Sequence, residues 1–358
     1  MNNPAPAHGP STPNSLSVVM PVRNAMPYLD AAVESILGQS LAAFEFVILD
    51  DGSTDGSYER LVEWAARDPR IVLSKSPAAP GLVSSGNQVV AMASGDIIAR
   101  MDADDIAHPD RLKRQVAVLG AHDDVVLVGC NWDGIDGDGQ PVRARVASML
   151  TSRRLSAPFC HGSILFRRSA FSRTGGYRQA CEFWEDTDFY YRMAQLGRVL
   201  VLPDLLYHYR FSESSARFNA NPPAVERAVD LYFRSSDVAG QAGGYENVLA
   251  AGPRPLAARV SPRVFAALSA HLVWAGRRPH TLRRALRRSQ APRSLLDWAS
   301  IAYLILGNAH PRLLRRLLNH LSQRRDRRAA RHFADGVPVE WHWSKQRNRG
   351  DLARQSRP

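Results

Sequence analysis

Lysine, cysteine and long apolar segments are scarce in this 358-residue sequence. The only lysines are Lys75, Lys113 and Lys345, so the formal net charge of +12 comes almost entirely from arginine. Three cysteines without a CxxC spacing argue against a disulfide framework and a zinc module, and they favour a reducing compartment. The longest charge-free apolar runs near the C-terminus, 264–276 and 298–311, are shorter than the ~20 residues that cross a bilayer.

Acidic residues are scarce in one part of the chain only. Residues 1–250 carry 23 basic and 29 acidic side chains, whereas residues 251–358 carry 23 basic and five acidic ones. With 45% hydrophobic and 22% charged residues, the composition excludes wholesale disorder. We expect a disordered leader over 1–14, which lacks the cationic start and apolar core of a secretory signal, a globular domain over 15–220, and a basic, mainly helical region over 221–358.

Short apolar runs alternate with amphipathic stretches from residue 16 onward. The runs 16–22, 44–51, 70–74 and 96–101 predict buried strands, and the stretches between them predict helices. Because parallel strands are joined by right-handed helical crossovers, this alternation predicts an α/β fold with a mostly parallel sheet.

Later in the domain, the pattern predicts strands over 125–132, 158–169 and 198–210. An Asp/Gly-rich stretch, 133–140, follows the first of them. It does not fit a calcium loop, because Pro141 stands where an EF-hand needs its glycine and no glutamate closes the loop. We expect a hairpin turn there.

Carboxylates gather where two of the expected strands end, and ligands of parallel sheets bind at that edge. Asp102 and Asp104, two positions apart, repel each other unless they are solvated or neutralised. Mg²⁺ or Mn²⁺ would neutralise them, and a solvated acidic turn is the alternative. Asp51 follows another strand and could accept a hydrogen bond from a nucleobase, although Asp-Gly-Ser is also ordinary turn chemistry.

Three further polar residues each allow a functional and a purely structural interpretation. Glu185 and Asp186 begin an expected helix, where the helix dipole favours acids without any function. A carboxylate beside a metal–phosphate site could instead act as a general base. His161 lies in an apolar segment and could be a ligand, a hydrogen-bond donor or a satisfied core histidine.

Several segments, in order, resemble family 2 glycosyltransferases, a large inverting group with the GT-A fold. LSVVMPVRNAMPYLDAAVESILGQSLAAFEFVILDDGSTDGS resembles the opening of that family, and GDIIARMDADDIAHPDRL resembles its DXD segment. FCHGSILFRRSAFSRTGGYR, WEDTDFYYRM and LLYHYR resemble its acceptor-side half. The resemblance covers roughly residues 16–215. It implies that 15–220 is a GT-A catalytic domain with a Rossmann-like, mostly parallel sheet flanked by helices.

The resemblance also implies roles on the donor side. Pro21 and Val22 would line the nucleotide pocket, and Asp51 would face the base. Asp104 would bind Mn²⁺ or Mg²⁺ on the diphosphate of the nucleotide sugar, with Asp102 helping directly or through water. Transfer from such a donor needs a Lewis acid for the departing diphosphate.

On the acceptor side, the resemblance implies that Asp186 is the general base that takes a proton from the acceptor hydroxyl. His161 and Glu185 would lie beside the donor sugar and the acceptor. One base and one displacement invert the anomeric carbon, whereas retention by the glycosidase route needs a second, nucleophilic group.

The sequence departs from the family at two positions. Arg23 stands where many relatives have tyrosine, and a guanidinium there can stack on the base or pair with phosphate. The stretch 84–87 lacks the arginine that relatives often show just before the asparagine. No QxxRW-like segment and no spanning helix are found, which argues for one sugar per encounter rather than processive synthesis.

The basic C-terminal region predicts a location. A leucine stripe beside paired arginines over 314–325 predicts a basic amphipathic helix that suits an anionic membrane surface. We expect a cytoplasmic, peripheral enzyme on the inner face of a bacterial plasma membrane, acting on a glycan or lipid-linked precursor of a surface polysaccharide. A solvated helical face and nucleic-acid binding are the alternatives for these arginines. A nucleotidyltransferase is a further alternative, but residues 21–25 lack the glycines that grip a triphosphate.

Overall fold

The computed structural model describes residues 15–76, 81–142, 159–211, 244–251 and 339–341. The chain forms two compact units, which are treated separately below. The first contains Met1–Asn131, Phe159–Arg178 and Arg192–Tyr207. The second contains Trp132–Pro158, Gln179–Tyr191 and His208–Pro358.

Four parallel strands form the centre of the first unit, as the apolar runs predicted. They are β1 (Leu16–Val22), β2 (Glu45–Asp50), β3 (Ile71–Lys75) and β4 (Ile97–Arg100). β1 pairs with β2 on one side and β4 on the other, and β2 pairs with β3. Because all four strands are parallel, their carboxyl ends meet at one edge of the sheet.

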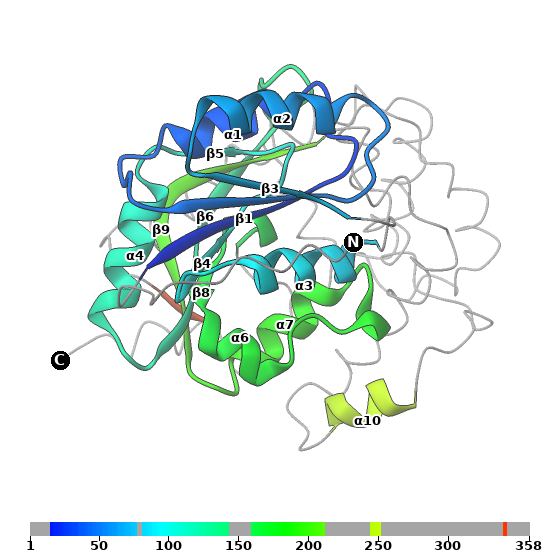
Figure 1. Ribbon diagram of the computed structural model, residues 1–358. Coiled ribbons are helices and arrows are strands. Elements are labelled where there is room, and N and C mark those ends of the chain that lie inside the picture. Colours follow the sequence, from blue (N-terminus) through cyan, green and yellow to red (C-terminus); the bar gives the residue numbers. More distant parts are fainter. Residues whose placement is uncertain (1–14, 77–80, 143–158, 212–243, 252–338, 342–358) are drawn as a thin grey trace, which may run out of the picture. The chain divides into compact units, whose positions relative to one another are not determined.

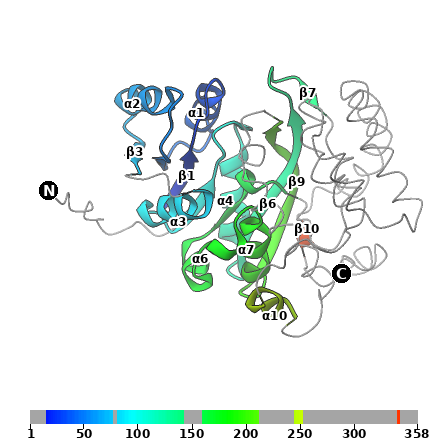
Figure 2. The same ribbon diagram turned by 90° about the vertical axis from the view of Figure 1, so that its right-hand side faces the viewer.

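Three helices connect these strands and cover both faces of the sheet. α1 (Leu29–Leu37) and α2 (Ser57–Arg67) lie on one face, and α3 (Leu82–Met92) lies on the other (Figure 1; Figure 2). α1 buries side chains at helical spacing, namely Leu29, Ala32, Val33 and Ile36. Apolar faces of this kind hold the helices on the sheet.

The prediction of a strand over 158–169 is wrong for most of this segment. The segment contains a 3₁₀ turn, η2 (His161–Ser163), and after it the short strand β8 (Leu165–Arg167). The hydroxyl of Ser163 donates to the carbonyl of Cys160 at 2.7 Å, and this local bond stabilises the turn in place of a strand ladder. β8 runs antiparallel to β4, so the sheet is mixed rather than wholly parallel.

The remaining elements of the first unit extend the sheet beyond β8. α4 (Arg111–Ala121) packs against β8, β5 (Ile106–Ala107) pairs with β9, and α6 (Arg168–Thr174) follows β8. β6 (Val125–Ile135) and β9 (Arg198–Arg210) begin in this unit and end in the other. The strand order is β9-β6-β8-β4-β1-β2-β3.

The described part of the second unit contains the predicted hairpin. β7 (Pro141–Val142) pairs antiparallel with the end of β6, and Asp136 and Gln140 close the turn through a 2.9 Å backbone bond. η3 (Gln179–Cys181) and α7 (Glu185–Met193) follow, the latter as predicted. The short elements α10 (Gly244–Ala250) and β10 (Val339–Trp341) complete it.

The predicted leader 1–14 and the leucine stripe over 314–325 lie outside the described residues. Of the basic region 221–358, the structure describes α10, β10 and one adjoining residue. Within the described ranges, none of the helices has the length and the apolar character that a membrane span requires.

Candidate functional site

A buried carboxylate lies at the carboxyl end of β2. Asp51 is 4% exposed, and its backbone N–H donates to the carbonyl of Val22 at 2.7 Å, which ties the ends of β2 and β1 together. Ser85 of α3 donates its hydroxyl to Asp51 Oδ2 at 3.1 Å, and Arg23 Nη1 lies 3.8 Å from the same oxygen. Pro21 is opposite Leu49 in the neighbouring strand. The structure therefore brings the predicted nucleotide-pocket residues together.

The environment of Asp51 suits it to accept a hydrogen bond from a ligand. Burial raises the pKa of its carboxyl, and the hydrogen bond from Ser85 and the charge of Arg23 act in the opposite direction. Its Oδ1 atom is buried and has no hydrogen-bond partner among the residues that the structure describes. Because a buried acceptor without a partner costs about 1–3 kcal/mol, an N–H group of a ligand would stabilise this site.

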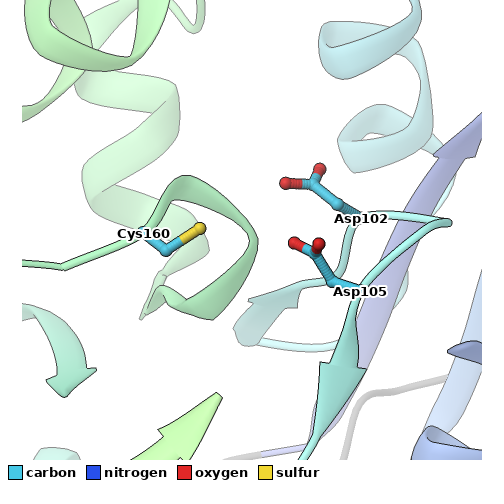
Figure 3. Close-up of side chains that lie close together, drawn as sticks. All are labelled: Asp102, Asp105 and Cys160. Atoms are coloured by element: carbon cyan, nitrogen blue, oxygen red, sulfur yellow. The ribbon is translucent and has the colours of Figure 1, made fainter. Parts of the chain in front are cut away.

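A second group of carboxylates follows β4 at the same edge of the sheet. Asp102 and Asp104 are partly exposed, whereas Asp105 is 1% exposed. Figure 3 shows the carboxylates of Asp102 and Asp105 side by side, with the thiol of Cys160 facing them. These three residues offer ligand atoms that all lie within 4.8 Å of one another.

The donor atoms of this cluster differ in which cations they suit. Burial raises the pKa of the Cys160 thiol well above its usual value, so the sulfur is protonated at neutral pH. A thiol binds metals as the thiolate, and Mg²⁺ and Mn²⁺ prefer oxygen ligands. The partly exposed carboxylates of Asp102 and Asp104 therefore fit a hard divalent cation, and the thiol does not.

A buried arginine hydrogen-bonds to the backbone next to this carboxylate segment. Arg111 of α4 is fully buried, and its Nη1 donates to the carbonyls of Arg100 and Gly162 at 2.9 and 3.1 Å. Its guanidinium also lies 5.5 Å from the ring centroid of Tyr207, whose hydroxyl accepts the Asp102 N–H at 3.3 Å. These contacts join β4, η2, α4 and β9 around one buried cation.

His161 begins the η2 turn, and its ring nitrogen Nε2 is buried. Its ring meets that of Tyr177 edge-on, with centroids 5.5 Å apart and an interplanar angle of 80°. Burial and then the charge of Arg100 lower the pKa of His161 well below its usual value. At neutral pH the imidazole is therefore uncharged, so it can offer a ligand hydrogen bonds but not a positive charge.

The stretch 84–87, which lacks the arginine that relatives often show before the asparagine, has a structural role in this chain. Asn87 holds the backbone of Tyr177 from both sides, donating to its carbonyl at 2.9 Å and accepting its N–H at 2.8 Å. A Cβ atom at Gly86 would lie 3.2 Å from the Tyr177 ring, so the glycine gives this ring the space that it occupies.

Of the three predicted acceptor-side residues, Glu185 and Asp186 belong to the second unit, in the first turn of α7, whereas His161 belongs to the first. Asp186 is partly exposed, and its Oδ1 accepts bonds from the backbone N–H and the hydroxyl of Thr187 at 2.5 and 3.1 Å. Glu185 is 7% exposed. Each predicted site residue is therefore described: Pro21, Val22, Arg23, Asp51, Asp102, Asp104 and His161 in the first unit, and Glu185 and Asp186 in the second.

Sequence reasoning missed three residues that hold the predicted ones in place. They are Ser85 on Asp51, Arg100 on Asp102, and Arg111 beneath the carboxylate segment. Arg100 carried a weak signal, since a charged residue at the end of an otherwise apolar strand needs a nearby counterion.

Comparisons with known proteins agree with the resemblance. Residues 17–175 match the family described as "Glycosyl transferase family 2". The glycosyltransferase EpsE of Bacillus subtilis (strain 168) is 34% identical over 225 residues, which cover 61% of this chain and 80% of that protein. The amylovoran biosynthesis glycosyltransferase AmsE of Erwinia amylovora is 27% identical over 210 residues, covering 57% and 78% of the two chains.

Solved structures share the fold. A mannosyltransferase from Pyrobaculum calidifontis, in complex with GDP-Man and Mn²⁺, matches with a TM-score of 0.51 at 20% identity over 86% of this chain and 90% of that one. S. aureus TarS 1-349, in complex with UDP-GlcNAc, matches with a TM-score of 0.52 at 18% identity over 82% and 90%. The mixed, mostly parallel sheet flanked by helices is therefore GT-A-like, as the sequence predicted.

Proposed function

Because this chain belongs to the family 2 glycosyltransferases, we propose that it transfers a sugar from a nucleotide-sugar donor to a hydroxyl of a glycan or lipid-linked glycan precursor, with inversion. The observation that carries the proposal is the pair of acidic sites, Asp51 after β2 and Asp102–Asp105 after β4, at one edge of a parallel sheet. The name of the AmsE relative, a biosynthetic glycosyltransferase for amylovoran, supports a role in surface polysaccharide synthesis.

In this proposal, Asp51 accepts an N–H of the nucleobase with the oxygen that lacks a partner among the described residues. Ser85 fixes the orientation of that carboxylate, and Val22 and Pro21 line the pocket. The Arg23 side chain is 53% exposed, and its Nη1 lies 3.8 Å from Asp51 Oδ2. An exposed guanidinium there can stack on the base or pair with a phosphate of the donor.

Asp104 and Asp102 would hold the divalent cation, Asp104 directly and Asp102 either directly or through water. Both carboxylates are partly exposed, as a site that must receive a diphosphate requires. When bound, Mn²⁺ or Mg²⁺ supplies a Lewis acid that stabilises the negative charge of the departing nucleoside diphosphate.

Asp186 would act as the general base on the acceptor. It takes the proton of the acceptor hydroxyl, the oxygen forms its bond to the anomeric carbon, and the bond from that carbon to the diphosphate oxygen breaks. Two hydrogen bonds from Thr187 fix the orientation of the Asp186 carboxylate and leave its other oxygen for the proton. His161 and Glu185 would lie beside the sugar and the acceptor, where a neutral imidazole can hydrogen-bond a hydroxyl.

The basic C-terminal region would place the enzyme on the anionic inner surface of a bacterial plasma membrane, facing the cytoplasm. Sedimentation with anionic liposomes tests this location, and retention on DNA at moderate salt would instead favour a nucleic-acid partner. Release of pyrophosphate in place of a nucleoside diphosphate would favour a nucleotidyltransferase.

The decisive experiment combines donor binding with turnover. A thermal-shift screen of UDP-, GDP- and dTDP-sugars, with and without Mn²⁺, identifies the donor. Asp104→Ala should abolish metal-dependent binding of the nucleoside diphosphate, whereas Asp186→Asn should bind the donor and lose transfer. Asp123→Ala, at an exposed loop position, is the matched control and should keep both properties. Retained turnover in Asp186→Asn would remove this residue from the role of base.

A further inference from the structure

The two carboxylate oxygens of Asp51 differ in their surroundings. Oδ2 accepts the hydroxyl of Ser85 at 3.1 Å and lies 3.8 Å from Arg23 Nη1. Oδ1 is buried and has no hydrogen-bond partner within the described part of the chain. The protein therefore already uses one oxygen of this carboxylate, and a ligand can use the other.

The hydroxyl of Ser85 is held at Oδ2 by the fold. Ser85 is 1% exposed, and its backbone N–H donates to the carbonyl of Gly81 at 2.9 Å, at the start of α3. The hydroxyl carries one proton and has two acceptors in reach, Asp51 Oδ2 and that same carbonyl. A hydrogen bond to an ionised acceptor is about twice as strong as one to a neutral acceptor, so the proton points to the carboxylate.

Nucleobases differ in the donors that they present side by side on the edge used for pairing. Uracil and thymine present one ring N–H between two carbonyls, whereas guanine presents a ring N–H next to an amino group. Cytosine presents an amino group next to an unprotonated ring nitrogen, which a carboxylate repels. One available oxygen matches the single N–H of uracil or thymine, and the exposed guanidinium of Arg23 offers N–H donors to an adjacent carbonyl. Guanine needs two free acceptors, because a buried amino group without a partner is costly.

We propose that Ser85 is a specificity-determining residue. By engaging Oδ2 of Asp51, it restricts the pocket to a base with one ring N–H between two carbonyls, uracil or thymine, and it disfavours guanine and cytosine. This inference rests on the proposed function for the binding of a nucleotide at Asp51, and it adds which nucleotides bind.

The test measures the binding of UDP, dTDP, CDP and GDP to the full chain by calorimetry in the presence of Mn²⁺. The wild type should bind UDP or dTDP at least ~10-fold more tightly than CDP and GDP, which is the discrimination that hydrogen bonds to a base edge provide. CDP is the most closely matched competitor of UDP, because the two differ only on the edge that meets Asp51.

Ser85→Ala removes the hydroxyl and leaves Oδ2 free to accept a second N–H. The ratio of the Kd of GDP to that of UDP should fall at least ~5-fold in this variant, since guanine then finds both acceptors. CDP should gain nothing relative to UDP, because its unprotonated ring nitrogen still meets a carboxylate.

Ser84→Ala is the matched control. It removes a hydroxyl from the neighbouring, partly exposed position of the same helix, and it should leave all four dissociation constants unchanged. Circular dichroism at the titration temperature confirms that each variant is folded. A merely structural role of Ser85 would weaken the four ligands by one common factor and leave their ratios as in the wild type.

Three results would overturn the inference. These are wild-type binding of GDP or CDP as tight as that of UDP and dTDP, unchanged ligand ratios in Ser85→Ala, and a gain of CDP in that variant equal to the gain of GDP. Failure of the proposed function has a different signature, because none of the four diphosphates would then bind and the inference would be wrong with it.

Discussion

Replacing Gly162 by alanine tests the packing beneath the carboxylate segment. A Cβ atom there would lie 2.0 Å from the Tyr207 hydroxyl, 2.8 Å from its ring carbon Cζ and 2.7 Å from Asp102 Oδ2. Ordinary contacts begin at 3.4 Å, so the hydroxyl would have to move by roughly 1.4 Å. Tyr207 is fully buried, and overpacking of this kind costs about 1–3 kcal/mol.

The assay is thermal and urea unfolding of the full chain. At about 2–4 °C per kcal/mol, Gly162→Ala should lower the Tm by about 2–12 °C. Gly120→Ala is the matched control, because a Cβ atom there meets nothing within 4 Å and alanine is the better helix former. Removing the clashing hydroxyl with Tyr207→Phe should restore a large part of the loss, and Mn²⁺-dependent nucleotide binding should fall in Gly162→Ala because Asp102 is displaced.

An unchanged Tm in Gly162→Ala would refute this reasoning, since the buried ring of Tyr207 would then have moved away without cost. A double variant with Tyr207→Phe that is no more stable than Gly162→Ala would refute the identity of the clashing atom. For contacting residues, the two effects should be non-additive by about 0.5–3 kcal/mol.

Three smaller predictions use the same unfolding assay or simple chemistry. Asn87→Ala should lower stability by about 1–3 kcal/mol, because it leaves the N–H and carbonyl of Tyr177 without their side-chain partner; an unchanged midpoint would contradict this. Cys160 should resist alkylation in the native protein and react on unfolding, since burial raises its pKa. The hydrogen bond that His208 Nδ1 donates to the Asp133 carboxylate raises the pKa of His208. Asp133→Asn should therefore destabilise the protein by at most about 1 kcal/mol at about pH 5.5 and by less at about pH 9; equal losses would contradict the pairing.

The direction of this pH effect follows from the raised pKa. The stabilisation from the His208–Asp133 pair is fully present below the unfolded pKa of histidine, about 6.5. It is lost as the pH rises through the higher pKa of the folded state, where the imidazole loses its charge. Both side chains are about a third exposed, which keeps the contribution small.

The sequence predicted the sheet well because the apolar runs are local signals. β1 was expected over 16–22 and spans Leu16–Val22, and the edge that carries Asp51 and Asp102 follows from the parallel order of the strands alone. The strand over 158–169 failed for a local reason as well. Apolar residues on both sides of Gly162 imitate a strand, and the bond from Ser163 to Cys160 closes a turn instead.

The supporting contacts of the site could not be predicted, because they join residues that are distant in sequence. Ser85 lies 34 positions from Asp51, and the Arg111 guanidinium reaches Gly162 across 51 positions. Periodicity indicates which residues are buried, but it does not indicate which buried polar groups meet. Arg100 and Asp102 are only two positions apart, yet a charge at a strand end is equally consistent with exposure to solvent.

In the first unit, arginine rather than lysine supplies the buried cations, in keeping with the scarcity of lysine in the sequence. The Nη1 atom of Arg111 donates to two carbonyls, and the guanidinium carbon Cζ lies 5.5 Å from the centroid of the Tyr207 ring. Lysine loses its charge readily on burial and lacks a planar fork, whereas arginine keeps its charge and fixes several acceptors in one geometry. Arg100 and Arg111 can therefore serve as permanent internal cations beneath an acidic edge. The arginine content of the chain thus has a use in the described sheet that is independent of any role in the basic C-terminal region.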